Sequence, residues 1–177
     1  MSQTEFITDV EIYNRVILET IGSAQEFLWL GTSDLKDLYV HKGKQMVPFL
    51  EILSGLVERG VAIRMIHAKE PGPAFQQDFD RYTNLITGME RILCPRIHFK
   101  TVVVDGKIAY SGSANLTGAG MGAKSANRRN FESGFITTDP EFVRQIMEQF
   151  DLIWMGKRCV KCQRKDFCTE YKDLMLI

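Results

Sequence analysis

The sequence lacks any long hydrophobic run. Its apolar stretches are far shorter than the roughly 20 residues that a helix needs to cross a bilayer. The N-terminal segment MSQTEFITDVEIYNR also lacks the apolar core of a signal peptide. We therefore expect a cytoplasmic protein with no membrane partner. An excess of charge of one sign is missing too, because 22 Lys and Arg side chains balance 22 Asp and Glu side chains. Any site for a polyanion must therefore be local.

The chain is also free of low-complexity segments and of internal repeats. With 177 residues, of which 45% are hydrophobic, it is long enough for one globular domain with a single core. We assign residues 1–155 to that domain and residues 156–177 to a short cysteine-containing C-terminal tail.

The hydrophobic pattern predicts alternating helices and strands. Capping-box spacing between Thr8 and Glu11 precedes an apolar stripe of helical period. A strand, helix, strand order then indicates a crossover unit of an α/β sheet. The expected elements are a helix over 8–21, a strand over 26–31, a loop or irregular helix over 32–45, a helix over 46–57, a strand over 61–67, a helix over 75–86, strands over 91–97, 98–106, 107–113 and 131–137, and a helix over 140–154 capped by Asp139.

The segment from His98 to Asn115 carries polar side chains at regular spacing. His98 and Lys100 lie two residues apart on an expected strand, so both side chains project from one face. Ser113 and Asn115 have the same spacing and follow Gly112, where a small loop can approach the first pair closely. Together an imidazole, an ammonium group, a hydroxyl and an amide can bind and neutralise a phosphoryl group.

These residues, with Asp105 between them, read HxKxxxxD followed by GSxN, which resembles the signature of the phospholipase D superfamily. The resemblance covers residues 1–155 and implies an α/β fold, namely an αβα sandwich around a mixed central sheet. It also implies a phosphodiesterase reaction. In that reaction His98 attacks phosphorus and forms a covalent phosphohistidine, and the histidine of a second motif protonates the leaving oxygen.

The resemblance assigns roles to the other motif residues as well. Lys100 and Asn115, helped by Ser113, stabilise charge on the non-bridging oxygens in the transition state. Glu132 occupies the place of the family's downstream acid and orients the histidine. Asp105 stands at a strand end before a glycine, where a structural turn or an ion pair is at least as suitable as proton transfer. We give it a supporting role.

The chain holds only one such motif, whereas the family chemistry needs two histidines. We therefore expect a homodimer in which two copies of His98 meet at a twofold axis, and association with a different motif-bearing chain is the alternative. The nucleophile is a side chain, and Lys100 supplies the charge that Mg²⁺ provides in other phosphoryl-transfer enzymes. The reaction is therefore expected to need no metal and no other cofactor.

A glycine-rich stretch from Gly118 to Asn130 ends in three cations, Lys124, Arg128 and Arg129. A flexible basic loop beside the motif can bind backbone phosphates, although a solvated loop is the alternative. With no membrane anchor and no apolar loop for lipid capture, we expect a nuclease that cleaves DNA or RNA, of the small endonuclease type. The alternatives are a phospholipid phosphodiesterase or transphosphatidylase, and a non-catalytic nucleic-acid-binding protein.

The tail carries cysteines at the spacing of metal ligands. Cys159, Cys162 and Cys168 form C-x2-C-x5-C, and Cys94 is a candidate fourth ligand because it precedes the strand that bears His98. In a reducing compartment such cysteines are thiols or ligands rather than disulfides. The run also resembles that of iron–sulfur-containing DNA glycosylases and RecB-like nucleases, which implies a [4Fe–4S] cluster. A zinc site and unconnected thiols remain alternatives, and any metal here would be structural.

Overall fold

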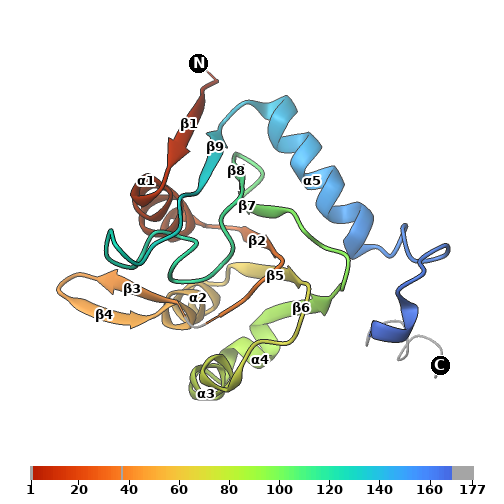
Figure 1. Cartoon of the computed structure of the whole chain (residues 1–177), viewed down its shortest axis with the longest axis horizontal. Helices are drawn as coiled ribbons and strands as arrows, with labels where there is room; N and C mark the ends of the chain where they lie inside the picture. Colours follow the sequence, from red (N-terminus) through yellow and green to blue (C-terminus); the bar gives the residue numbers. More distant parts are fainter. Residues whose placement is uncertain (1, 37, 169–177) are drawn as a thin grey trace.

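The computed structural model describes residues 2–36 and 38–168, and its architecture is shown in Figure 1. A large sheet contains seven strands in the order β1-β9-β8-β7-β2-β5-β6, and β3 and β4 form a separate hairpin. The strands are β1 (Thr4–Thr8), β2 (Phe27–Thr32), β3 (Tyr39–Lys42), β4 (Gln45–Pro48), β5 (Ala62–His67), β6 (Met89–Leu93), β7 (Lys100–Val104), β8 (Ile108–Gly112) and β9 (Ser133–Thr137). The helices are α1 (Val10–Ile12), which continues as a π-helix over Tyr13–Thr20 and a 3₁₀ turn over Ile21–Ser23, α2 (Phe49–Glu58), α3 (Pro73–Arg81), α4 (Asn84–Gly88), α5 (Pro140–Trp154) and a 3₁₀ turn over Lys165–Phe167.

The sheet is mixed because its two halves are connected differently. β2, β5 and β6 run parallel, and the connections between them pass through α2 and through α3 and α4. β7, β8, β9 and β1 pair antiparallel, and β7 also runs antiparallel to β2. A tight turn at Asp105 and Gly106 joins β7 to β8, as the sequence predicted.

Helices cover both faces of this sheet. Along β7, Val102 and Val104 point into the larger core, which also contains residues of α1, the π-helix and α2. Val103 points the other way and packs with Trp29 and Phe150 under α5. The predicted αβα sandwich with a mixed central sheet is therefore confirmed. Within the described ranges no helix combines the length and the apolar composition that crossing a bilayer requires.

Two segments form strands that the sequence did not predict. The loop predicted over 32–45 instead contributes β3 to the β3–β4 hairpin, and β1 precedes the first helix. Both are weakly patterned, because in β1 only Ile7 is buried and in the hairpin only Val40 and Val47 are. Few buried side chains leave no clear alternation of apolar and polar residues, so the strands depend on backbone pairing that the sequence does not display.

Phe150 packs α5 against the sheet. Its buried ring stacks on Trp29 of β2 with 4.9 Å between ring centroids, and on Trp154 of α5 with 5.8 Å. We expect Phe150→Ala to lower the free energy of unfolding by about 3–5 kcal/mol, since the large cavity cannot close fully. Chemical denaturation measures this change. Phe142→Ala, on the same helix at a position 54% exposed, is the control and should lose less than about 1 kcal/mol. Equal losses for the two variants would contradict this packing.

Candidate active site

Four of the motif residues, His98, Lys100, Ser113 and Asn115, lie at one edge of the sheet, where β2, β5 and β8 end and β7 and β9 begin. In the ladder of β7 and β8, Lys100 lies opposite Gly112. In the ladder of β7 and β2, Thr101 lies opposite Gly31, so the end of β2 reaches the same edge. His98, Ser113 and Asn115 therefore lie on segments that leave neighbouring strands at one place.

His98 lies just before β7 and not on the strand as predicted, because pairing of β7 with its neighbours begins only at Lys100. The two side chains nevertheless meet. The Lys100 ammonium donates to the His98 carbonyl oxygen at 2.6 Å and contacts Nδ1 of the imidazole at 3.2 Å. An ammonium group can only donate, so this contact places a hydrogen-bond donor beside Nδ1. His98 is exposed to solvent, whereas Lys100 is only 6% exposed.

Burial lowers the pKa of the Lys100 ammonium, and the negative charge of Glu132 partly opposes that shift. Two of its three N–H groups point at His98, so the third is available to another acceptor. A partly desolvated cation next to an exposed imidazole is suited to a phosphoryl oxygen.

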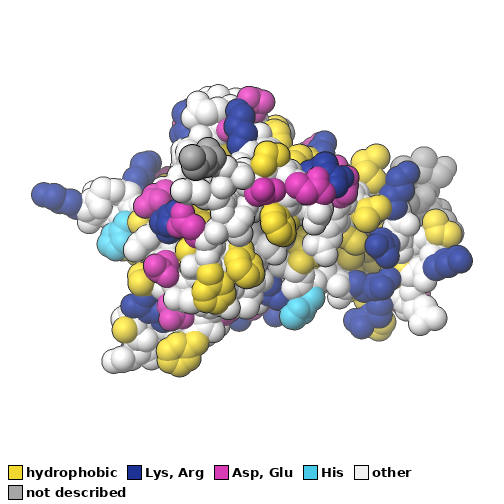
Figure 2. All heavy atoms as spheres, turned by 90° about the horizontal axis from the view of Figure 1, so that it is seen from above, with side chains coloured by type: hydrophobic (Ala, Val, Ile, Leu, Met, Phe, Trp, Pro, Cys, Tyr) yellow, Lys and Arg dark blue, Asp and Glu magenta, His cyan; other side chains and the backbone are white. Residues whose placement is uncertain are grey.

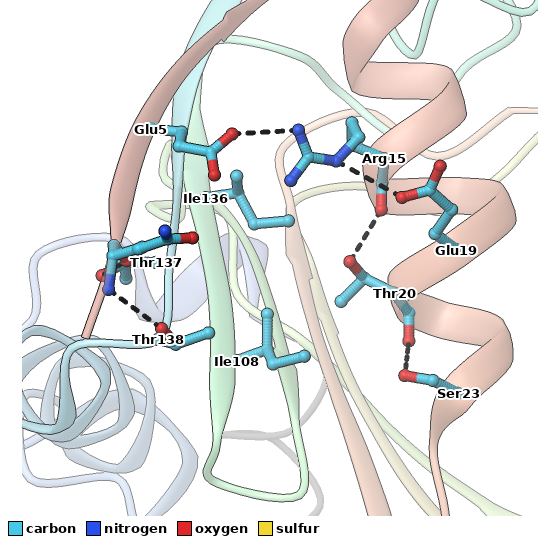
Figure 3. Close-up of a pocket in the computed structure, with 10 residues that line it drawn as sticks. Glu5, Arg15, Glu19, Thr20, Ser23, Ile108, Ile136, Thr137 and Thr138 are labelled. Atoms are coloured by element: carbon cyan, nitrogen blue, oxygen red, sulfur yellow. Dashed lines mark hydrogen bonds and ion pairs between the residues drawn. The ribbon is translucent and has the colours of Figure 1, made fainter. Parts of the chain in front are cut away.

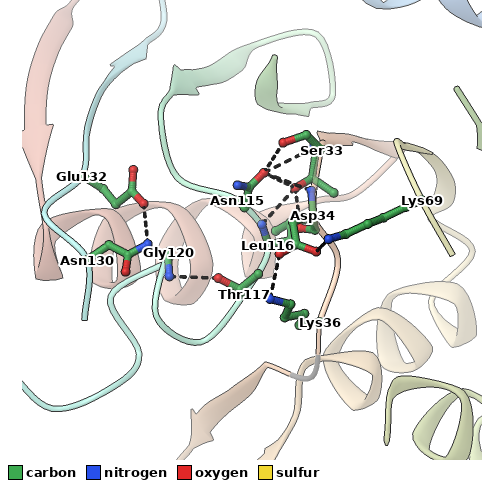
Figure 4. A network of polar contacts seen from close by, with 11 residues as sticks. Ser33, Asp34, Lys36, Lys69, Asn115, Leu116, Thr117, Gly120, Asn130 and Glu132 are labelled. Carbon is green, nitrogen blue, oxygen red and sulfur yellow. Dashed lines mark hydrogen bonds and ion pairs between the residues drawn. The ribbon is translucent and has the colours of Figure 1, made fainter. Parts of the chain in front are cut away.

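Glu132 is brought to Ser113 and not to His98. The Ser113 hydroxyl donates to the Glu132 carboxylate, which also accepts from the side-chain amide of Asn130 at 3.0 Å. Figure 4 shows the Asn130 contact. The backbone N–H of Glu132 donates to the Asp9 carboxylate at 3.0 Å. No hydrogen bond joins Glu132 to His98 within the described ranges, so its orienting role stays a prediction.

Asn115 is fixed through its side-chain oxygen. That oxygen accepts from the Ser33 hydroxyl at 2.8 Å, from the backbone N–H of Ser33 at 3.2 Å and from that of Asp34 at 3.1 Å (Figure 4). The amide NH₂ has no protein acceptor in the part of the chain that the structure describes. Asn115 therefore has two donors to offer a ligand, in an orientation set by the end of β2.

Sequence analysis did not identify the residues that hold Asn115. Thr32 is the last residue of the buried strand β2, and Ser33 and Asp34 follow it. Asp34 forms ion pairs of 3.0 Å with Lys36 and with Lys69. A run of short polar residues directly after an apolar strand was the available signal. This run can be linked to Asn115 only when the pairing between β2 and β7 is known, and the sequence does not show that pairing.

The glycine of the GSxN motif is required by a close approach. A Cβ atom at Gly112 would lie 2.3 Å from the hydroxyl oxygen of Tyr110 and 2.5 Å from the carbonyl oxygen of Ser133. Any larger residue would therefore displace β9 or the buried Tyr110 ring. Burial also raises the pKa of that phenol to about 12.

The basic loop lies beside this edge. Its base is closed by a hydrogen bond of 3.1 Å from the backbone N–H of Asn130 to the carbonyl oxygen of Ala119. Lys124 and Arg128 are exposed and Arg129 is half-buried. Their side chains make no hydrogen bond or ion pair with the described residues, so their charges remain available to an anion.

The four cysteines have free thiols and are each half-buried. The Cys168 thiol lies 3.8 Å from the carbonyl oxygen of Leu93, which directly precedes Cys94. Within residues 2–36 and 38–168, however, no group of three or more histidine, cysteine or acidic side chains is arranged to hold a metal ion. The metal site therefore stays a prediction.

A separate hollow of about 310 Å³ lies away from the motif (Figure 3). It is found where β8 begins and β9 ends, at Ile108 and Thr137, which is the opposite edge of the sheet. Arg15 lines it and is paired with Glu5 at 3.0 Å and with Glu19 at 3.3 Å. None of the motif residues reaches this hollow.

Asp105 also lies at the far end of β7 from His98, where it connects two strands. Its carboxylate accepts from the backbone N–H groups of Glu26 and Phe27, both at 2.9 Å, and of Gln25 at 3.0 Å. Burial acts to raise the pKa of Asp105, but these hydrogen bonds outweigh it and the pKa is lowered. Asp105 thus ties the turn after β7 to the start of β2.

We expect Asp105→Asn to lower the free energy of unfolding at pH 7 by about 1–3 kcal/mol, because charged acceptors bind backbone N–H groups more strongly than an amide does. A carboxylate with a lowered pKa stabilises the fold above its unfolded value of about 3.9, and this contribution is lost as pH falls through the folded pKa. The difference from the parent protein should therefore shrink below about pH 4. Asp80→Asn, an exposed carboxylate of α3, is the control. A difference independent of pH would contradict the assigned role.

The chain is similar to known proteins in sequence and in fold. Among curated proteins the chain is similar to the mitochondrial cardiolipin hydrolase of Chlamydomonas reinhardtii, at 24% identity over 105 residues. That match spans 59% of this chain and 44% of the relative's length, so it covers less than half of that protein.

Two solved structures share the fold. NucT from Helicobacter pylori superposes with a TM-score of 0.63 at 15% identity, covering 85% of this chain and 94% of NucT. Nuc from Salmonella typhimurium, a phospholipase D family member, superposes with a TM-score of 0.66 at 17% identity, covering 87% of this chain and 95% of Nuc. A family model described as "Cardiolipin synthase, PLD-like domain" matches residues 17–154. The chain therefore belongs to the phospholipase D superfamily of phosphodiesterases.

Proposed function

We propose that the protein is a metal-independent nuclease that cleaves phosphodiester bonds through a covalent phosphohistidine on His98. The observation that carries this proposal is the contact of 3.2 Å between an exposed imidazole and a buried ammonium group, His98 and Lys100. The amide NH₂ of Asn115 and the Ser113 hydroxyl, which donates to Glu132, lie at the same edge of the sheet. We propose residues 1–155 as the catalytic domain.

In the proposed reaction a ring nitrogen of His98 attacks phosphorus, a nitrogen–phosphorus bond forms, and the bond to the leaving oxygen breaks. The leaving oxygen takes a proton from a second imidazole. Water then attacks the phosphohistidine, gives its proton to that second imidazole and releases the product phosphate ester. Lys100 and the amide of Asn115 stabilise the charge on the non-bridging oxygens throughout.

The second imidazole in this proposal is His98 of the partner subunit in a homodimer. The other two histidines of the chain do not fit the role. His67 is 1% exposed, and its Nδ1 lies 2.8 Å from the carbonyl oxygen of Lys69. His41 is on the separate β3–β4 hairpin. A twofold axis near His98 would supply the missing group with no further residue.

Nucleic acid is the proposed substrate because unpaired positive charge and an exposed aromatic ring lie beside the motif. The side chains of Lys124, Arg128 and Arg129 are free to bind backbone phosphates. Phe131, which directly precedes Glu132, is 95% exposed and offers a flat face on which a base can stack. A sugar-phosphate chain with bases can use both features at once.

A phospholipid phosphodiesterase is the second candidate. The family model's description and the cardiolipin hydrolase relative favour it, and the catalytic residues would be the same. Purified protein should be assayed on DNA and RNA oligonucleotides and on vesicles of cardiolipin or phosphatidylcholine. Cleavage of vesicles without cleavage of oligonucleotides would replace the proposed substrate and leave the proposed catalytic residues in place.

We expect His98→Asn to lower the cleavage rate at least a thousandfold, because it removes the nucleophile while it conserves size and polarity. Cleavage by the parent protein should survive brief treatment with EDTA, since no step uses a metal ion. The rates are measured on a fluorescent oligonucleotide. His41→Asn, an exposed histidine of the hairpin, is the matched control and should keep full activity. A His98→Asn rate within tenfold of the parent, or strict dependence on added Mg²⁺, would refute the mechanism.

The dimer leads to a second expectation. When an excess of His98→Asn protein is mixed with parent protein and the subunits exchange, activity per parent chain should fall severalfold, because most parent chains then lack an intact partner. Sedimentation velocity on the same samples reports the oligomeric state. A fully active monomer would overturn the shared site. The same excess of His41→Asn protein should leave the activity unchanged.

The basic loop can be tested by changing Lys124, Arg128 and Arg129 together to Gln. Loss of up to three phosphate contacts should raise KM for an oligonucleotide and reduce the slope of log affinity against log salt by about 2. The rate on bis(p-nitrophenyl) phosphate, which is too small to reach the loop, should stay the same. A control with equal charge change replaces Arg59, Lys107 and Arg144, which lie on other parts of the surface. Equal effects of both triple variants would argue against a binding role for the loop.

A further inference from the structure

The segment after α5 is folded without a hydrophobic core of its own. Within residues 156–168 no side chain is buried, and the two large apolar side chains, Val160 and Phe167, are 80% and 66% exposed. The backbone nevertheless makes successive turns and ends in the 3₁₀ turn at Lys165–Phe167. A short segment that buries none of its apolar side chains needs another source of order, such as a metal or a covalent crosslink.

The cysteines are the side chains that this segment turns toward the domain. Five of its residues are half-buried, and three of them are Cys159, Cys162 and Cys168, whereas Val160 and Phe167 point into solvent. In a segment folded by apolar packing the opposite arrangement is expected. The inward face of the tail is therefore defined by thiols.

The backbone sets the first two thiols close together. The N–H of Cys159 donates to the carbonyl oxygen of Gly156 at 2.9 Å, and the N–H of Cys162 donates to that of Cys159 at 3.0 Å. These consecutive turns bring the two ends of the C-x-x-C pair together, as metal-binding pairs require. Cys168 follows the 3₁₀ turn, and its N–H donates to the carbonyl oxygen of Lys165 at 3.0 Å.

The inward thiols face the loop that joins β6 to β7, which runs beside the end of α5 in Figure 1. The thiol of Cys168 approaches the carbonyl oxygen of Leu93 at 3.8 Å, and Cys94 is the next residue of that loop. The tail therefore contacts the loop directly beside Cys94.

We propose that Cys94, Cys159, Cys162 and Cys168 form a tetrathiolate metal centre that joins the C-terminal tail to the loop preceding His98. Each thiol would release its proton to solvent as the metal binds, and the four sulfurs would be its ligands. In residues 2–36 and 38–168 the thiols are not arranged as a coordination shell, so binding would have to bring them together.

Positive charge around the cysteines favours this state, because four thiolates carry more negative charge than the metal neutralises. Dark blue side chains gather over the tail at the right of Figure 2. The cations of this segment are Lys157, Arg158, Lys161, Arg164 and Lys165.

The centre has a consequence for the catalytic edge. Cys94 precedes His98 by four residues, and the intervening loop contains Pro95 and the buried side chain of Ile97. A metal bond at Cys94 fixes one end of this loop, and the hydrogen bonds of Lys100 fix the other. The cysteines thus act as positioning residues for the histidine and take no part in phosphoryl transfer.

The test is metal analysis of the full chain purified without oxygen. We expect either about one zinc per chain without colour, or about four irons per chain with broad absorbance near ~400 nm. Either result supports the tetrathiolate centre, and the two distinguish its occupant. Cys162→Ser and Cys94→Ser should each lose most of the metal, whereas Gln163→Ser, which changes an exposed neighbour, should retain it.

Limited digestion with trypsin provides a second readout that is independent of catalysis. Residues 156–168 of the tail contain five Lys and Arg residues, and in the metal-loaded protein the chain should be cut there at least tenfold more slowly than in Cys162→Ser. Absence of stoichiometric metal after anaerobic purification and reconstitution would overturn the proposal. Full metal retention by Cys94→Ser would also overturn it, because the centre would then not join the tail to the catalytic loop. Neither outcome bears on whether His98 is the nucleophile.

Discussion

An ammonium group buried at the first residue of a central strand must find acceptors close by, because a charge removed from water without partners is strongly destabilising. Lys100 finds them in the residue two positions earlier, through the carbonyl oxygen and the imidazole of His98. The chain before β7 is therefore held against the sheet edge. The same hydrogen bonds hold the imidazole near a desolvated positive charge. One local interaction thus connects the packing of the sheet to the chemistry at its edge.

The rest of the edge is built by strand pairing around Lys100. Gly112 lies opposite it, and the absence of a side chain there allows Tyr110 and the backbone of β9 to pack closely. Asn115 follows the end of β8, and its side-chain oxygen accepts a hydrogen bond from Ser33, which follows the end of β2. At the far end of β7, Asp105 holds the turn after that strand to the start of β2. Residues of one motif therefore lie at both ends of β7. His98 and Lys100 at its start serve the proposed chemistry, whereas Asp105 at its end stabilises the fold.

Sequence reasoning succeeded where a periodic pattern or a fixed spacing carried the information. The buried strands and α5, with its Asp139 cap, follow from apolar periodicity and helix-end chemistry. The spacing of the motif predicted that the segments bearing His98 and Asn115 lie close together. It failed at β1 and the β3–β4 hairpin, whose side chains are mostly exposed. It also missed the partners of Asn115. The hydrogen bond from Ser113 to the Glu132 carboxylate was not predicted either, and the orienting role of Glu132 towards His98 stays a prediction. These contacts join residues far apart in the chain, and no local pattern encodes them.

The central claim is that His98 forms a bond to phosphorus during turnover. Rapid quenching of the protein with an oligonucleotide labelled at the scissile phosphate, followed by digestion at alkaline pH and mass spectrometry, tests it directly. The account predicts a labelled, acid-labile phosphoramidate on His98 that appears before the hydrolysed phosphate ester and is absent in His98→Asn. Cleavage that proceeds with no label on His98 would contradict the account.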